Sequence, residues 1–152
     1  AIKLTLNEAK TGLRDARRER FDFLGYGFGP ERYRKDGHGY LAAQPSGRAV
    51  RRLKGRIGVL LRPGNQKPWP EVVARLNRML IGWANYFGYG TRLVAYRAID
   101  HYVYHRAADF LRRRHKVRQR CVRRYSADAI FGKFGVQRLR ALRVGAPACA
   151  TA

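Results

Sequence analysis

The sequence predicts a mainly helical α+β fold in which a β-hairpin precedes a bundle of three helices and a basic extension follows it. Three stretches, at about 47–62, 70–87 and 91–116, carry apolar residues at the 3.6-residue spacing of an amphipathic helix. Ahead of them, residues 21–43 hold two β-prone pieces around a polar, glycine-rich stretch. With 152 residues and 45% hydrophobic content, the chain can form one compact core.

The helices divide the chain into three regions. Residues 1–45 contain the hairpin, residues 46–118 contain the three helices, and residues 119–152 are a basic C-terminal extension that we expect to be partly flexible. The chain begins at Ala1 in what reads as the middle of a fold, so we expect it to be a fragment of a longer protein.

The predicted hairpin joins FDFLGYGF, residues 21–28, to GYLAA, residues 39–43, through a long loop. Gln44-Pro45-Ser46 then breaks the strand, and the Ser46 hydroxyl is suited to cap the first helix. The apolar side chains that this helix should place in the core are Val50, Leu53, Ile57, Leu60 and Leu61.

The second helix is expected to begin at Pro70, with the negative charge of Glu71 favourable in its first turn, and to end before Gly88-Tyr89-Gly90. Its predicted core residues are Val73, Leu76, Leu80, Trp83, Ala84 and Phe87. Tyr86 and Tyr89 fit either packing within the protein or stacking on a ligand.

A third helix is expected from about Thr91 to Lys116. Its predicted inner face consists of Tyr96, Ile99, Val103, Ala107 and Phe110. A short helix around residues 127–131 and a loose end rich in Gly and Ala should follow. Because the three amphipathic helices are joined by short or modest loops, we expect them to pack as a small bundle.

The charge of the chain points to a polyanionic partner. Lys and Arg number 33 against 10 Asp and Glu, which gives a net charge of +23, and such a density favours nucleic acid. The excess is concentrated after residue 45, where twenty-four basic residues accompany four acidic ones. We therefore expect the nucleic-acid-binding surface in that part of the chain.

Basic side chains fall on the outward face of each predicted helix. In the first two helices the candidates for nucleic-acid contact are Arg48, Arg51, Arg52, Arg56, Arg75, Arg78 and Asn85. In the third helix and the basic run after it they are Arg97, Arg112, Arg113, Arg114, Lys116, Arg118, Arg120, Arg123 and Arg124. The alternative is a solvated face, although such faces usually mix both signs of charge. For residues 112–124 the alternative is a disordered tail, which RNA could also order.

Gly55 and Gly82 lie among these arginines, although a glycine inside a helix costs about 1 kcal/mol relative to alanine. A sugar-phosphate backbone could approach the helices closely at these positions. The alternatives are close approach of another part of the protein, or simple tolerance of glycine.

The sequence contains no set of residues suited to catalysis. His101 and His105 have the i, i+4 spacing of a metal-chelating pair, but they lack a clear third ligand, so we assign them to a basic face. A nucleophile–base–acid set, a phosphate-cradling loop and a close pair of acids are all missing. We therefore expect no catalytic residue, no metal, no cofactor and no small-molecule substrate in this chain.

Cysteine usage and hydropathy indicate where the protein works. Cys121 and Cys149 have neither CxxC partners nor metal-ligand spacing, which fits a reducing compartment. No apolar run approaches the roughly 20 residues of a membrane span. We expect a location in the bacterial cytoplasm and no membrane partner.

The segment LNRMLIGWANYF, residues 76–87, resembles the LN, GW and NYF signature of the group II intron maturase-specific domain, the X or thumb region of group II intron reverse transcriptases. LNEAKT, residues 6–11, resembles the Lys-Thr element near the end of the polymerase palm, and FDFLGYGF resembles the Phe-Leu-Gly element that approaches the primer strand. SGRAVRRLKGRIGVLL is similar to the first thumb helix, and IFGKFGVQRL to the end of the maturase region. The resemblance covers residues 6–140 in the family's order.

The resemblance implies a thumb bundle that binds intron RNA, assists splicing and grips the template-primer duplex during reverse transcription. It also implies primer-grip-like roles for Lys10, Phe23, Leu24 and Gly25. The Tyr-Ala-Asp-Asp motif of the polymerase is absent from this sequence, so its Mg²⁺ ions would belong to a catalytic site outside the chain. The expected parent is an RNA-directed DNA polymerase, whose oligomeric state stays open.

Two other functions fit the same residues. The chain could be a non-catalytic fragment of an RNA-directed DNA polymerase that acts only in primer-template binding. It could also be a generic basic scaffold of a ribonucleoprotein particle, which would not distinguish intron RNA from other structured RNA.

Overall fold

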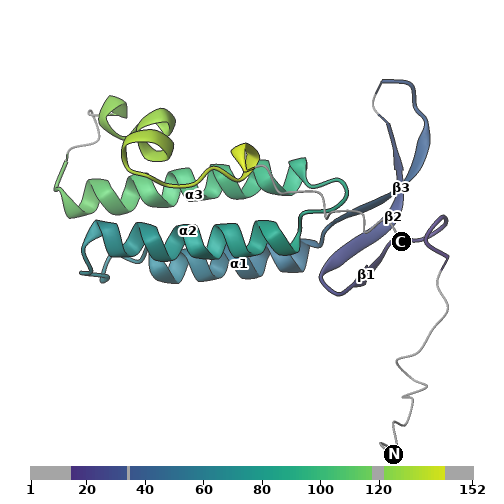
Figure 1. The fold of residues 1–152 in the computed structure, drawn as a ribbon, viewed down its shortest axis with the longest axis horizontal. Helices are drawn as coiled ribbons and strands as arrows, with labels where there is room; N and C mark the ends of the chain where they lie inside the picture. The colour runs from purple at the N-terminus through teal and green to yellow at the C-terminus, as the bar shows by residue number, and fades with distance from the viewer. Residues whose placement is uncertain (1–14, 34, 118–121, 143–152) are drawn as a thin grey trace, which may run out of the picture.

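The computed structural model describes residues 15–33, 35–117 and 122–142. Strands β1 (Phe21–Phe23), β2 (Tyr26–Arg32) and β3 (Gly39–Pro45) come first, followed by helices α1 (Gly47–Leu60), α2 (Trp69–Tyr86) and α3 (Leu93–Arg114). The short turns η2 (Val122–Tyr125), η3 (Ala129–Lys133) and η4 (Leu139–Ala141) complete the described chain. The sheet lies at one end of an elongated bundle, and the last turns lie along α3 (Figure 1). The predicted α+β class is confirmed.

The expected hairpin is in fact a three-stranded antiparallel sheet with the order β1-β2-β3. The additional strand arises within FDFLGYGF, where Leu24 and Gly25 form a tight turn between the paired residues Phe23 and Tyr26. Both turn residues have positive φ, 48° at Leu24 and 82° at Gly25, as a type I′ turn requires. The sequence gives a weak signal for this turn because leucine rarely adopts positive φ.

The three helices begin close to their predicted positions. The Ser46 hydroxyl accepts a hydrogen bond from the Ala49 backbone N at 3.2 Å, so the predicted cap of α1 is confirmed. Proline occupies the first turn of α2, together with Glu71. Helix α3 is two residues shorter at each end than predicted.

Apolar side chains of the three helices meet in one core. Its members from the three helices and from Leu61, the residue that caps α1, are Leu53, Ile57, Leu61, Val72, Leu76, Leu80, Ala84, Tyr96, Ile99, Val103, Ala107, Ala108, Phe110 and Leu111. In α2 the observed stripe differs from the prediction, because Val72 is buried whereas Val73 is only partly buried. Phe87 is buried as expected, whereas Trp83 lies at the edge of the core.

Backbone contacts fix the sheet against the bundle. Thr91 N donates to Ala43 O at 2.8 Å, and Ser46 N donates to Gly25 O at 2.8 Å. Gly90 has φ of 66°, and a Cβ at this position would lie 2.0 Å from Ala43 O. Glycine is therefore required where the connection between α2 and α3 crosses β3.

Residues 122–142, which belong to the predicted basic extension, pack on the bundle. Their contribution to the common core consists of Tyr125, Ile130, Val136 and Leu139. The Asn77 side chain on α2 donates to Gly135 O and accepts from Gln137 N, both at 2.8 Å. The expected short helix at 127–131 is the π-helical turn η3. The boundary between residues 118 and 119 stays a prediction.

A buried carboxylate on α3 holds the last turn. Asp100 is 4% exposed. Its Oδ1 accepts from Leu139 N at 2.8 Å, and its Oδ2 accepts from the backbone N and the Nε of Arg140, both at 3.3 Å. Since a buried carboxylate is costly unless it is paired and hydrogen-bonded, these contacts explain why this acid is tolerated in the core.

Replacing Asp100→Asn should lower the free energy of unfolding by about 1–3 kcal/mol, because an amide removes the charge and offers only one acceptor oxygen to this set of donors. Urea unfolding measures the loss. The matched control is Asp109→Asn, whose ion pair with Arg112 is half exposed and should contribute less than about 1 kcal/mol. Equal losses in the two variants would contradict the role assigned to Asp100.

Candidate nucleic-acid interface

Two adjoining hollows form a groove along α1 and α2. The first lies beside the sheet and has a volume of 630 Å³, and the second lies beside the loop between α1 and α2 and has a volume of 890 Å³. Both are lined by Arg52, Arg56, Arg78 and Met79, so they are parts of one depression. We call it the α1–α2 groove.

The α1–α2 groove is strongly cationic. Its basic lining residues are Arg52, Arg56, Arg62, Lys67, Arg75 and Arg78. Lys67 forms an exposed ion pair with Glu71, but no acidic residue is among the described residues that line the groove. Four of the predicted nucleic-acid-binding arginines are thus brought together on one surface, in a field that attracts a polyanion.

Gly55 and Gly82 open onto this groove, one in each hollow. A Cβ built on either glycine would meet no heavy atom of the described chain within 4 Å. Gly58 differs, because its Cβ would lie 3.1 Å from the Tyr102 hydroxyl on α3. Close packing by the described protein therefore accounts for Gly58 but not for Gly55 or Gly82, which leaves approach of a ligand or simple tolerance.

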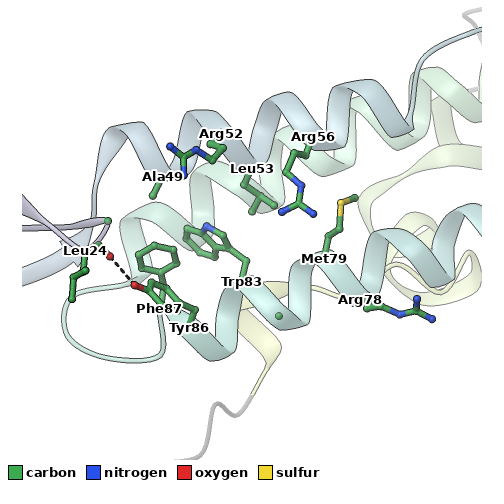
Figure 2. Close-up of a pocket in the computed structure, with 12 residues that line it drawn as sticks. Leu24, Ala49, Arg52, Leu53, Arg56, Arg78, Met79, Trp83, Tyr86 and Phe87 are labelled. Atoms are coloured by element: carbon green, nitrogen blue, oxygen red, sulfur yellow. Dashed lines mark hydrogen bonds between the residues drawn. The ribbon is translucent and has the colours of Figure 1, made fainter. Parts of the chain in front are cut away.

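The first hollow has an apolar wall. The Trp83 ring packs against Phe87 and Tyr96, with centroid distances of 4.6 and 5.8 Å, and the same side chain lines the hollow. Figure 2 shows Trp83 and Met79 pointing from α2 toward α1, with the Arg56 guanidinium reaching into the same space. Trp83 thus serves both the core and the groove, whereas the sequence indicated the core alone.

The turn between β1 and β2 closes the sheet end of the groove, where Leu24 and Gly25 line the first hollow. The Tyr86 hydroxyl donates to Leu24 O, and the Tyr26 hydroxyl donates to Tyr86 O, both at 2.9 Å. The Tyr26 hydroxyl is protonated at neutral pH and can donate this hydrogen bond, and burial raises its pKa further above the usual value of 10.0. Tyr86 is thus held by hydrogen bonds, but its side chain is 56% exposed and lines the hollow, so stacking on a ligand stays a prediction. Leu24 and Gly25, for which primer-grip-like roles were predicted, line the same hollow as Arg52, Arg56 and Arg78.

Several predicted contact residues are exposed outside the groove. On the helices these are Arg48, Arg51, Asn85 and Arg97. Phe23 is also exposed, next to the β1–β2 turn, and so is Tyr89. Lys10, Arg118, Arg120 and the side chain of Arg123 lie outside the described residues. Nothing in the fold decides whether these residues contact nucleic acid, so they stay predictions.

The C-terminal end of α3 carries a second, smaller basic area. Arg112, Arg113 and Lys116 line a hollow of 430 Å³ with Asp109, and Arg112 pairs with that acid at 3.3 Å. The exposed Arg124 lies over the Tyr125 ring, 5.9 Å from its centroid. Because Asp109 offsets part of the charge, this area is less suited to a polyanion than the groove.

Arg114 has an intramolecular role that the sequence did not indicate. Its guanidinium donates to the backbone oxygens of Gln66, at 3.2 Å, and Lys67. It also lies 5.9 Å from the Phe110 ring centroid. Arg114 thus holds the loop that forms the far end of the α1–α2 groove.

The histidine pair on α3 lies at the surface. The Nε2 atoms of His101 and His105 lie 3.1 Å apart on the exposed face. Within the described ranges, no group of three His, Cys, Asp or Glu residues could hold a metal ion. Among the same residues, no helix is both long and apolar enough to cross a membrane.

Arg62, Lys67 and Met79 are among the groove residues that were missed from the sequence. Arg62 and Lys67 belong to the loop between α1 and α2, to which the sequence assigned no functional role. Met79 lies on α2 and was likewise not predicted to line a site. The signal available was the basic character of this loop, because both of its charged residues are positive. Their position beside Arg75 depends on the way the loop folds back, which local sequence does not reveal.

Residues 50–126 match the model of a protein family, the group II intron, maturase-specific domain. The match covers half of the chain and includes most of α1 and all of α2 and α3. The chain therefore belongs to the family of the group II intron maturase-specific domain. A comparison with curated proteins found no match. The matched domain is non-catalytic, in agreement with the expectation that this chain is not itself an enzyme.

The open space at the two groove glycines predicts a gain in stability. Gly55→Ala and Gly82→Ala should each raise the free energy of unfolding by up to about 1 kcal/mol, because alanine favours the helix and nothing in the described chain obstructs its methyl group. Gly58→Ala should gain less, because the Tyr102 hydroxyl must shift. Chemical denaturation of the three variants checks this order.

The same variants separate ligand approach from tolerance. If an RNA backbone uses the open space, Gly82→Ala should lower the affinity for intron RNA severalfold in spite of its higher stability. Gly47→Ala is the matched control, because this first residue of α1 is equally open but does not line the groove. Unchanged affinity in both Gly55→Ala and Gly82→Ala would support tolerance.

Proposed function

We propose that this chain binds structured group II intron RNA along the α1–α2 groove and thereby assists the folding of the intron for splicing. The observation that carries the proposal is the convergence of Arg52, Arg56, Arg75 and Arg78 on a groove without acidic residues among its described lining. Membership of the maturase-specific family supports intron RNA as the polyanion.

The chemistry of the groove favours recognition through the RNA backbone. Arginines hydrogen-bond phosphate oxygens, and each neutralised phosphate releases counterions, which adds to affinity. Helical RNA hides most base edges in a deep, narrow groove, so proteins bind it largely through shape, phosphates and 2′-hydroxyls. Gly55 and Gly82 allow such a backbone to approach the helices more closely than any other residue would.

The proposal extends to the parent protein. There the same groove would grip a template-primer duplex, with Leu24 and Gly25 at its sheet end. The parent would be an RNA-directed DNA polymerase of the bacterial cytoplasm, with its Mg²⁺ ions held by a catalytic site outside this chain. In this proposal, the described residues bind and position the nucleic acid and catalyse no reaction.

Removing the four groove charges should weaken RNA binding and flatten its salt dependence. For the combined Arg52→Ala, Arg56→Ala, Arg75→Ala and Arg78→Ala variant, the slope of log K against log salt should decrease by roughly 0.7–0.9 for each phosphate that the variant no longer neutralises. Fluorescence anisotropy with labelled intron RNA at several salt concentrations measures both quantities.

A variant of equal net charge controls for nonspecific electrostatics. Its substitutions to alanine are at Arg17, Arg18, Arg32 and Lys35, all exposed and outside the groove lining. This control variant should retain most of the affinity for intron RNA and most of the slope of log K against log salt. Equal losses in the two variants would refute the groove as the binding surface.

Competing nucleic acids distinguish the remaining functions. A generic scaffold would bind ribosomal RNA fragments as tightly as intron RNA at moderate salt. A protein that acts only in primer-template binding would prefer a short RNA–DNA duplex to intron RNA. The proposed function requires that intron RNA competes better than either.

A further inference from the structure

We propose that the first hollow of the α1–α2 groove receives one unpaired nucleobase of the bound RNA, which stacks against the exposed side of Trp83. The inference rests on the proposed function and specifies which RNA feature the site selects. Its basis is the difference between the two ends of the groove. The sheet end is lined by the aromatic residues Trp83, Tyr86 and Phe87. The loop end has no aromatic residue among its described lining and is bordered by Arg62, Lys67 and Arg75.

The first hollow suits the face of a base better than a phosphate. Its apolar walls come from three elements and comprise Leu24, Ala49, Leu53, Met79 and Trp83. Its volume of 630 Å³ lies within the range of about 300–1,000 Å³ that is usual for ligand pockets. Apolar and aromatic side chains bind base faces with little regard to sequence, because every base has a π-face.

Charges at the edge of the hollow match the rest of a nucleotide. Arg52, Arg56 and Arg78 line the same hollow, so the phosphates on either side of an inserted base would meet guanidinium groups. In Figure 2 the Arg56 guanidinium points from α1 into the space between Trp83 and Met79, whereas Arg78 extends away along α2. Gly82, one turn after Arg78 on α2, leaves its part of the hollow open, and the sugar-phosphate backbone would pass there.

The wall formed by the β1–β2 turn is held in a costly conformation. Leu24 has φ of 48° and is 69% exposed, and left-handed backbone costs a non-glycine residue about 1–2 kcal/mol. Tyr86 holds the Leu24 carbonyl, and Ser46 N holds the carbonyl of Gly25. Neither the core nor the sheet needs an exposed leucine at this position, whereas a base in the hollow would bury its side chain.

The hollow selects an unpaired base because only such a base presents its face. In a duplex the bases stack on their neighbours and show proteins only their edges. A bulged or looped nucleotide can leave the stack and enter the hollow while the flanking helix rests on the arginines. The groove would thus recognise an RNA helix that has an unpaired nucleotide at one position.

The emission of Trp83 tests this inference directly. Trp69→Phe leaves Trp83 as the remaining tryptophan of the two in the chain, and circular dichroism verifies the fold of the variant. Three labelled RNA hairpins are compared: one with a single-nucleotide bulge, one with an abasic bulge and one fully paired. We expect the bulged hairpin to quench Trp83 and to bind about fivefold to a hundredfold more tightly than the other two.

Leu24→Gly provides a second readout that does not depend on the tryptophan. Glycine adopts positive φ freely, so the turn should be retained while one wall of the hollow is removed. The preference for the bulged hairpin should fall, with little change for the paired one. Leu41→Ala is the control, because this exposed leucine lies on β3 and does not line the groove.

The outcomes separate the inference from the proposed function. Equal affinity for the three hairpins and equal quenching, with salt dependence retained, would overturn the nucleobase site and leave backbone binding in place. Failure of every hairpin and of intron RNA to bind would defeat the proposed function itself. Selective quenching by the bulged hairpin, reduced by Leu24→Gly, would support both.

Discussion

Crowding of like charges along the α1–α2 groove is the constraint that the rest of the structure must satisfy. The groove arginines repel one another across neighbouring helices. Beneath them, Leu53 and Ile57 of α1 pack in one core with Leu76 and Leu80 of α2. Burial of each such side chain stabilises the fold by about 1.5–3 kcal/mol, whereas two solvated charges interact by about 1 kcal/mol or less. The apolar faces therefore hold the basic faces together.

Both ends of the groove are fixed by contacts between distant parts of the chain. At the sheet end, Tyr86 and Ser46 hold the β1–β2 turn, and Gly90 allows the α2–α3 connection to cross β3. At the other end, Arg114 reaches from α3 to the backbone of the loop between α1 and α2. Because these intramolecular contacts fix both ends of the groove, binding would require little further ordering of the protein.

Regular local features of this fold could be predicted from the sequence, and features made by long-range contacts could not. The Ser46 cap and the core stripes of α1 and α3 follow from spacing and local hydrogen bonding. The positive φ of Leu24 contradicts local preference and depends on partners far away in the chain. Likewise, the sequence gives no sign that Asp100 is buried, because its burial depends on the distant segment near Leu139, whose backbone N donates to its carboxylate. Outward arginines could be found in the sequence, but their convergence on one groove required the packing of α1 on α2.

Photo-crosslinking of bound intron RNA, followed by mass spectrometry of the attached peptides, tests the central claim most directly. The account predicts that the crosslinks concentrate on residues 52–62 and 75–83, the two sides of the α1–α2 groove, and decline as salt is raised. Crosslinks confined to the outer face of α3 or to residues 112–124, with none on α1 or α2, would contradict it.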